Sequence, residues 1–386
     1  MNTIPPVDLT RQHQAINQEL EERVLQVLRS GRYIGGTAVT NFETEFASYI
    51  GTELGVGCNS GTDALYMALR ALGIGKGDEV ITTPFTFIAT SEVIVRVGAK
   101  PVFVDIHRDT FNLDLDLVES AITSKTKAII AVHLFGRPLD MTRLMAIAKS
   151  ANLYVIEDCA QATGAAWQGQ KVGSIGDAGC FSFFPTKNLG GCGDGGALTT
   201  NSEAIAKQTI LLREHGLVRD AATVTYRHEV TGLNSRLDAL QAVILSTKLQ
   251  HLDSWNKQRT TAARSYCSLL QHLDIVKLPT APSHRGCTST WNQFTISLPN
   301  QHQGSETTRD IVRSKLKHQG VIAMVYYPLP LHLQPVYEEL GYKQGSLPVV
   351  EQAAQEVLSL PMFPGITTEE QQQVVSTLVS CLEAVY

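Results

Sequence analysis

The 386-residue chain lacks the patterns that are typical of membrane proteins, secreted proteins and nucleic-acid-binding proteins. No apolar run approaches the roughly 20 residues that a membrane-spanning helix needs. The N-terminus has no charged region followed by an apolar one, so we expect no signal peptide. The formal net charge is -5 and no basic run occurs, which argues against a nucleic-acid partner. We therefore expect neither a membrane nor a nucleic acid among its partners.

The sequence also lacks cysteine motifs. Its seven cysteines include no CxxC pair and no spacing that is typical of metal ligands. In a chain of this length, such cysteines are typical of reduced thiols in a cytoplasmic protein, so we expect a cytoplasmic location and no metal site. The composition, with 43% hydrophobic and 18% charged residues, is that of an ordinary soluble globular protein. The length allows roughly two or three domains.

Short β-branched runs alternate with helical patterns through the first half of the chain. The predicted strands are residues 79–83, 101–105, 128–132 and 153–156. Such an alternation predicts a parallel sheet that is covered by helices on both faces. Binding sites in sheets of this kind form at the carboxyl ends of the strands, where Thr83, Asp105, His133 and Asp158 fall.

The second half of the chain predicts a smaller α+β unit. Residues 235–270 form one long helical pattern, which we expect to bend and to link the two parts. The remaining predicted elements are strands at 291–298 and 321–327 and helices at 306–318 and 368–385. We therefore predict a large domain over residues 1–250, with an N-terminal arm, and a small domain over residues 251–386.

A single lysine, Lys187, lies in a glycine-rich loop between predicted strands at 178–183 and 196–200. Taken alone, such a residue is most simply a surface lysine, but it is also a candidate Schiff-base nucleophile or phosphate binder. Earlier in the chain, Ser60-Gly61-Thr62 stands between a predicted strand and a helix. This start is either an anion site at the helix N-terminus or simple capping by Ser60 or Thr62.

Lys187, Asp158 and the helix start together match what pyridoxal phosphate requires. This cofactor needs a lysine for a Schiff base, a carboxylate that keeps the pyridine nitrogen protonated, and an anion site for its phosphate. Asp158 could also be a strand-end carboxylate that binds only backbone or water. The combination nevertheless favours a pyridoxal phosphate site over three unrelated features.

The order of these motifs resembles the DegT/StrS family of pyridoxal-phosphate-dependent nucleotide-sugar aminotransferases, from about Val7 to the C-terminus. The segments that carry the resemblance are residues 31–34, 59–65, 85–90, 157–161, 182–190, 193–196, 234–238 and 327–332. The family has fold type I of the aspartate aminotransferase superfamily. The resemblance therefore implies an α/β fold with a three-layer αβα large domain, a mostly parallel central sheet and a smaller α+β C-terminal domain.

The resemblance also implies roles around the cofactor ring. Lys187 matches the lysine that forms the Schiff base and moves the proton, and Asp158 matches the partner of the pyridine nitrogen. Gln161 matches the residue near the ring and its 3-oxygen. Phe87 matches the aromatic residue that stacks on the ring, although a core aromatic is the alternative for that position.

The remaining matches concern the phosphate and the substrate. Gly61, Thr62 and Ser182 match phosphate ligands, and Asn234 matches a ligand that the other subunit supplies, which implies a homodimer with shared active sites. The positions that meet the substrate in relatives are Arg32, Tyr33, His133, Arg236, Tyr326 and Tyr327. Arg236 could instead pair with Asp238 or solvent, and His133 could be a satisfied strand-end histidine.

The implied reaction moves an amino group from L-glutamate to the ketone of a UDP- or dTDP-linked oxo-sugar, for the biosynthesis of amino sugars in polysaccharides or glycosides. Residues 234–238 and 327–330 look more like those of relatives that aminate C3 than C4, and a 4-oxo sugar is the alternative. A dehydratase of the same fold carries a histidine in place of Lys187. A cofactor-binding sensor without turnover is a further alternative.

Overall fold

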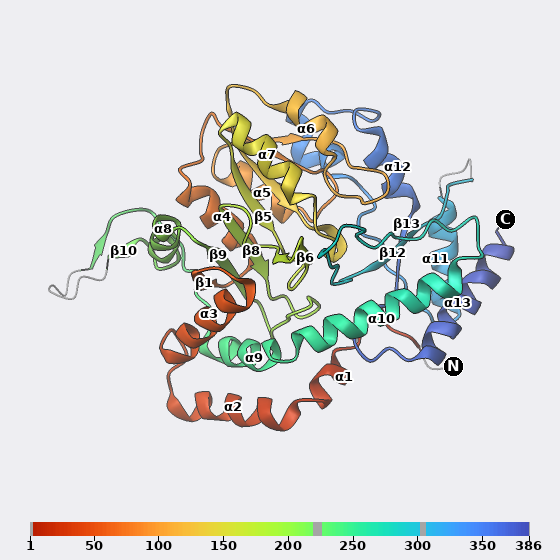
Figure 1. Cartoon of the computed structure of the whole chain (residues 1–386), viewed down its shortest axis with the longest axis horizontal. Helices are drawn as coiled ribbons and strands as arrows, with labels where there is room; N and C mark the ends of the chain where they lie inside the picture. Colours follow the sequence, from red (N-terminus) through yellow and green to blue (C-terminus); the bar gives the residue numbers. More distant parts are fainter. Residues whose placement is uncertain (1–2, 219–225, 302–305, 386) are drawn as a thin grey trace.

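The computed structural model describes residues 3–218, 226–301 and 306–385. A seven-stranded sheet forms its centre (Figure 1), in the spatial order β1-β9-β8-β5-β4-β2-β3. All neighbouring pairs are parallel except those of β9, which runs antiparallel to both β1 and β8. The strands are β1 (Leu54–Cys58), β2 (Glu79–Thr82), β3 (Lys100–Phe103), β4 (Thr126–Val132), β5 (Tyr154–Asp158), β8 (Ala178–Ser182) and β9 (Gly196–Thr200).

Helices cover both faces of this sheet. One face packs against α4 (Gly61–Ala71), α5 (Ala89–Arg96) and α8 (Glu203–Arg213), and the other against α3 (Thr37–Ile50), α6 (Leu115–Ala121), α7 (Met141–Ala151) and α9 (Ala239–Leu249). Strand β4 shows why two cores form, because successive side chains of a strand point to opposite faces. Ala128 and Ile130 join the first core, whereas Ile129 and Ala131 join the second. The predicted three-layer arrangement is confirmed.

The C-terminal part has a core of its own, which includes Tyr266, Phe294, Val312 and Leu378. Its elements are α10 (Leu252–Leu270), β12 (Phe294–Ser297), α11 (Thr308–His318), α12 (Pro348–Glu356), β13 (Val357–Leu360) and α13 (Thr368–Glu383), and β12 pairs antiparallel with β13. This is the expected α+β unit. The boundary at residue 250 stays a prediction, since α10 packs against both parts through its two ends.

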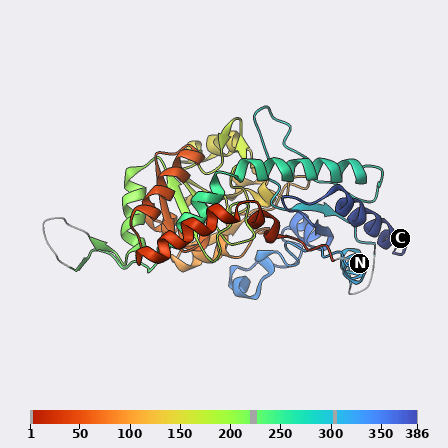
Figure 2. The same cartoon turned by 90° about the horizontal axis from the view of Figure 1, so that it is seen from below.

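The remaining elements are short or peripheral. They are α1 (Leu9–Gln14), α2 (Asn17–Ser30), β6 (Ala166–Trp167), β7 (Gln170–Lys171), β10 (Leu217–Val218), β11 (Arg227–His228) and the 3-10 helices η1 (Leu134–Gly136), η2 (Leu331–Leu333) and η3 (Pro335–Leu340). The N-terminal arm reaches the small domain, where Ile4 pairs with Val321 (Figure 2). Among the described residues, every helix falls short of the length and apolar character that crossing a bilayer requires.

Two further predictions concern the linker between the two parts and a strand of the small domain. The long helical pattern bends as expected, at Gln250 and His251 between α9 and α10. The predicted strand at 321–327 is wrong, because this segment makes only isolated bridges, from Val321 to Ile4 and from Met324 to Ser359. Its β-branched and aromatic residues resemble a strand, but its backbone partners come from two separate segments, so no continuous ladder forms.

The reversal of β9 builds the edge of the sheet at which the site lies. Because β9 runs opposite to its neighbours, its first residue, Gly196, lies beside the last residues of β1 and β8, Cys58 and Ser182. A side chain at Gly196 would collide with the start of α4, since an added Cβ would lie 2.3 Å from the carbonyl carbon of Ser60. Glycine therefore allows three chain segments to converge at this edge.

The carboxylate of Asp105, just beyond the end of β3, ties the sheet to α12. It accepts hydrogen bonds from the backbone N–H groups of Val349 and Val350, each with an N–O distance of 2.9 Å. These N–H groups belong to the first turn of α12, where the helix itself supplies no acceptor. A residue that is distant in sequence thus caps the helix and joins the two parts of the chain.

We predict that Asp105→Ala lowers the free energy of unfolding by about 2 kcal/mol, because it removes a buried helix cap. The measurement is urea denaturation followed by circular dichroism. Asp116→Ala is the matched control, since Asp116 pairs with Arg143 on the surface and an exposed pair contributes little. Equal midpoints for the two variants would contradict the predicted tie.

Candidate active site

One cavity of about 410 Å³ lies at the carboxyl ends of the parallel strands. Val132, Asp158 and Ser182 reach it from the ends of β4, β5 and β8, and Gly195 from the start of β9. The cavity brings together most of the predicted cofactor and substrate residues, namely Gly61, Thr62, Phe87, Asp158, Gln161, Ser182, Lys187, Tyr326 and Tyr327. These residues are far apart in sequence, and the sheet edge is what gathers them.

The start of α4 offers free N–H groups to the cavity. Ser60 caps the helix, because its Oγ accepts a hydrogen bond from the Asp63 N–H at 3.1 Å. The N–H groups of Gly61 and Thr62 precede the first helical hydrogen bond and find no acceptor inside the helix. Gly61 also lies against the end of β8, where an added Cβ would be 2.8 Å from the Ser182 Cβ. Capping and anion binding are therefore compatible here, and the site fits a phosphate.

The cavity holds the buried carboxylate of Asp158 and the amine of Lys187, and burial shifts the pKa of both. Burial raises the pKa of Asp158, and this rise is opposed by the Thr90 hydroxyl, the Ala160 N–H and the Lys187 ammonium. Burial lowers the pKa of Lys187, and Asp158 opposes that change. Lys187 lies in the turn between the antiparallel strands β8 and β9, as its flanking glycines predict. Burial thus disfavours the charged form of each group, and the opposite charge of the other group partly offsets this effect.

Gln161 is held from two sides. Its Oε1 accepts a hydrogen bond from the Phe135 N–H at 2.6 Å, and its Nε2 donates to the Tyr327 hydroxyl at 3.1 Å. Phe135 has a φ of 58°, which is rare for a residue with a side chain and lies within η1. Burial raises the pKa of Tyr327, so its hydroxyl stays protonated. Gln161 therefore presents its amide in one orientation beside Asp158.

Two aromatic rings stand at the cavity without being buried. Phe87 is 60% exposed and Phe184 is 51% exposed, and both line the cavity. The alternative interpretation of Phe87 as a core aromatic is wrong. Large apolar side chains left open beside a cavity are typical of a surface that receives a flat ligand or another protein chain.

His133 does not reach the cavity, which corrects the expectation that it contacts a substrate. Its side chain is fully buried. Nδ1 accepts a hydrogen bond from the Leu139 N–H at 3.1 Å, so Nε2 carries the proton and donates it to Glu157 Oε2 at 3.1 Å. The alternative of a satisfied strand-end histidine therefore describes His133 correctly.

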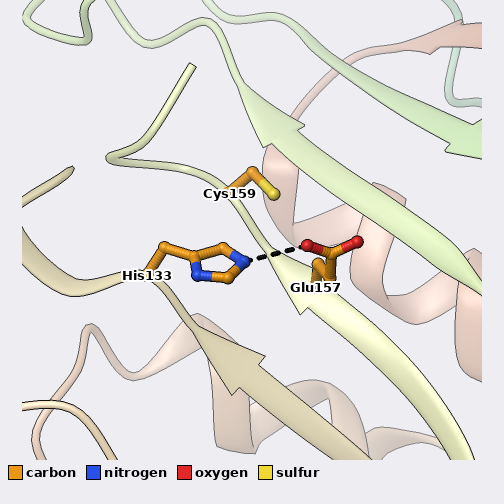
Figure 3. A group of neighbouring side chains, drawn as sticks. All are labelled: His133, Glu157 and Cys159. Carbon is orange, nitrogen blue, oxygen red and sulfur yellow. Dashed lines mark hydrogen bonds and ion pairs between the residues drawn. The ribbon is translucent and has the colours of Figure 1, made fainter. Parts of the chain in front are cut away.

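His133, Glu157 and Cys159 nevertheless form a compact group of side chains that could in principle bind a metal (Figure 3). Glu157 also accepts hydrogen bonds from three backbone N–H groups, those of Gly173, Ile175 and Gly176. Burial raises the pKa of the Cys159 thiol well above its ordinary value. The Glu157 carboxylate and both His133 ring nitrogens already form hydrogen bonds within the protein. The group therefore serves to hold the loop of residues 173–176 in place.

The other four predicted residues, Arg32, Tyr33, Asn234 and Arg236, lie outside this cavity. Arg32 and Tyr33 lie beside the segment that follows Arg236, because the Ala239 N–H donates to the Tyr33 carbonyl oxygen at 2.9 Å and Ile34 pairs with Asp238. Asn234 lies two residues before Arg236 and pairs with Glu214. Tyr33 and Asn234 are exposed there. Among the described residues, Arg236 forms no ion pair with Asp238. Arg32 is also exposed, and Arg236 is half-buried. We name these four residues the second cluster.

Sequence reasoning missed several cavity residues. Thr86 and Thr90 lie inside a motif that was recognised, but their hydroxyls carried no distinct signal beyond a spacing of four. Gln293 enters from the small domain, immediately before β12, and Asp194 lies in the glycine-rich loop. Only the packing of the two domains reveals that Gln293 shares a cavity with Lys187.

Comparison with known proteins gives consistent results. Residues 14–379 match the DegT/DnrJ/EryC1/StrS aminotransferase family. The chain is 48% identical over 377 residues to a protein of Geobacillus stearothermophilus named "Pleiotropic regulatory protein", covering 97% of each chain. It is 46% identical over 367 residues to an Acidithiobacillus ferrooxidans UDP-N-acetyl-3-dehydro-alpha-D-glucosamine 3-aminotransferase, covering 95% of each chain.

Solved structures show the same relationship. The crystal structure of S. venezuelae DesV in complex with a ketimine intermediate matches with a TM-score of 0.92 and 40% identity, over 98% of each chain. NtdA of Bacillus subtilis, solved with its bound cofactor PMP, matches with a TM-score of 0.88 and 31% identity, over 99% of this chain and 86% of that one. The chain therefore belongs to the DegT/DnrJ/EryC1/StrS aminotransferase family and is a pyridoxal-phosphate-dependent aminotransferase.

Proposed function

We propose that this aminotransferase moves an amino group from L-glutamate to the ketone of a nucleotide-linked 3-oxo sugar. The observation that carries the proposal is the convergence of Lys187, Asp158 and the α4 start in one cavity. The relative from A. ferrooxidans, which is named for a UDP-linked 3-dehydro sugar, supports C3 as the position of amination. A 4-oxo sugar is the alternative.

The residues of the cavity fit pyridoxal phosphate group by group. The free N–H groups of Gly61 and Thr62, with the Ser182 hydroxyl, would hold the phosphate. Asp158 would hold the pyridine nitrogen, Gln161 would lie near the ring oxygen, and the open ring of Phe87 would stack on the cofactor. When bound, pyridoxal phosphate supplies an aldehyde that takes up the amino group and a ring that withdraws electrons from the substrate carbon.

Lys187 would move the proton of the reaction. Burial lowers the pKa of its Nζ, which increases the fraction of neutral amine that can accept a proton from the substrate carbon. The carboxylate of Asp158 limits this shift, so the amine also remains able to give the proton back. A general acid–base group works best when its pKa lies close to the working pH.

The cavity alone is short of positive charge for such substrates. Lys187 is the only cationic side chain that lines it within the described residues, whereas a nucleotide sugar carries a diphosphate and glutamate carries two carboxylates. The second cluster holds two arginines, the exposed Arg32 and the half-buried Arg236, together with Tyr33 and Asn234. We therefore propose a homodimer in which the second cluster of one subunit completes the cavity of the other.

A regulatory role is the second candidate, because a relative with 48% identity is named as a regulatory protein. A pure sensor would bind the cofactor or the sugar without turnover. The lysine and carboxylate that transamination requires are both in the cavity, which supports the enzyme. We also propose a cytoplasmic location, which the seven free thiols support.

We predict that Lys187→Ala abolishes transfer of the amino group and removes the lysine-dependent visible absorbance band of the bound cofactor. Lys171→Ala should keep both, since the Lys171 ammonium lies over the Tyr49 ring, away from the cavity. The measurement follows amine products by mass spectrometry from UDP- and dTDP-linked 3-oxo and 4-oxo sugars with glutamate. Cofactor binding without any amine product would support the sensor instead, and preference for 4-oxo sugars would overturn C3.

We predict that mixing Lys187→Ala with Asn234→Ala restores activity if Asn234 acts in the other subunit. After subunit exchange, half of the dimers are mixed, and one of their two sites has both native residues. About one quarter of the wild-type activity should therefore return. The control mixes each variant with itself. If Asn234 acts within its own subunit, no site in the mixed dimer is complete and no activity returns.

A further inference from the structure

Two threonine hydroxyls connect the cavity wall to the Asp158 carboxylate. The Thr90 Oγ1 lies 2.8 Å from Asp158 Oδ2, and the Thr86 Oγ1 lies 3.0 Å from the Thr90 Oγ1. All three side chains are buried, with relative exposures of 1% for Thr90, 4% for Thr86 and 6% for Asp158. Thr86, Thr90 and Asp158 also all line the cavity. The contacts form a chain of hydrogen bonds between side chains buried in the cavity wall.

The chemistry of the groups sets the direction of this chain. An ionised carboxylate can only accept hydrogen bonds, so the Thr90 hydroxyl must donate its proton to Asp158. The Thr90 oxygen is then free to accept, and Thr86 donates to it. Hydroxyls linked in this way polarise one another, which strengthens the bond that ends on the charge.

The local structure explains why the two hydroxyls meet. Thr90 is the second residue of α5, and Thr86 lies four positions earlier in the loop that enters the helix. A threonine hydroxyl in a helix often bonds back to the carbonyl four residues before it. Here the Thr90 hydroxyl donates to Asp158 instead, and the Thr86 hydroxyl, four residues earlier, donates to the Thr90 oxygen.

Asp158 has few other donors. Among the described residues, its second carboxylate oxygen accepts only from the Ala160 N–H, at 3.2 Å. A buried charge that loses a donor keeps the cost of its own desolvation, and the neutral form gains. The Thr90 hydroxyl is therefore one of the two hydrogen-bond donors that the described residues offer to this carboxylate.

We propose that Thr86 and Thr90 form a hydroxyl chain that keeps Asp158 ionised and turns its free lone pairs toward the pyridine nitrogen of the cofactor. Thr90 acts as a positioning residue through Asp158, and Thr86 acts through Thr90. This inference rests on the proposed role of Asp158. It predicts that the hydroxyls matter only for ligands that have a ring nitrogen for Asp158 to bind.

The test compares two ligands on the purified apoprotein: pyridoxal phosphate and its 1-deaza analogue, which has a C–H group in place of the ring nitrogen. Thr90→Val keeps the branched shape and removes the hydroxyl. We expect it to bind pyridoxal phosphate about tenfold more weakly and the analogue with unchanged affinity, because a hydrogen bond to a charged group is lost in the first case alone. Equilibrium dialysis gives both dissociation constants.

Three further variants complete the design. Thr90→Ser keeps the hydroxyl and should bind both ligands as the wild type does. Thr86→Val removes only the outer link and should weaken pyridoxal phosphate binding about threefold, again without affecting the analogue. Thr209→Val is the matched control, since its buried hydroxyl donates only to the Ile205 carbonyl oxygen in α8. It should change neither dissociation constant.

Each result decides a different point. Equal weakening of both ligands by Thr90→Val or Thr86→Val would show a purely structural role and overturn the hydroxyl chain. A wild-type protein that binds both ligands equally well would overturn the role of Asp158 itself, and the chain with it. If Thr90→Val does not fold, Thr86→Val carries the same comparison, and Thr90→Ser remains the control that keeps the hydroxyl.

Discussion

The buried carboxylate of Asp158 is the constraint on which the rest of the site depends. A carboxylate at this depth is stable only if donors surround it, and the structure supplies the Thr90 hydroxyl and the Ala160 N–H. Its charge also opposes the lowering of the Lys187 pKa that burial causes. One carboxylate therefore binds the Thr90 hydroxyl at the start of α5 and influences the basicity of the reactive lysine.

The sheet places these groups because one strand is reversed. If β9 ran parallel to β8, the segment that carries Lys187 would have to run from the end of β8 back to the opposite edge of the sheet, where β9 would begin. The antiparallel pair instead keeps that loop at the edge where β5 presents Asp158 and β1 leads into α4. Gly196 makes this compact arrangement possible, because any side chain there would displace the start of α4. The reversed strand β9 therefore determines both the strand order at this edge and the close approach of the α4 start, which is the proposed phosphate site.

Much of this could be predicted from sequence, and the failures have identifiable reasons. Strong periodicity placed the parallel strands, and the cofactor's chemical needs linked Lys187 with Asp158. Short-range patterns could not show that the segment from Val321 onward pairs with two separate partners. Short-range patterns also could not show that both ring nitrogens of His133 form hydrogen bonds inside the core. Thr90 was missed because a threonine becomes informative only when its partner is known.

Positive charge is scarce in the cavity of a single subunit. Within one subunit, the cavity combines a carboxylate, a lysine and open aromatic rings, and it lacks the cations that a diphosphate would require. The exposed Arg32 and the half-buried Arg236 lie outside that cavity. If the second cluster of a partner subunit completes the cavity, as proposed, its two arginines would supply the positive charge that a diphosphate requires. The same charge near Lys187 would lower the pKa of the lysine further and favour its neutral, proton-accepting form.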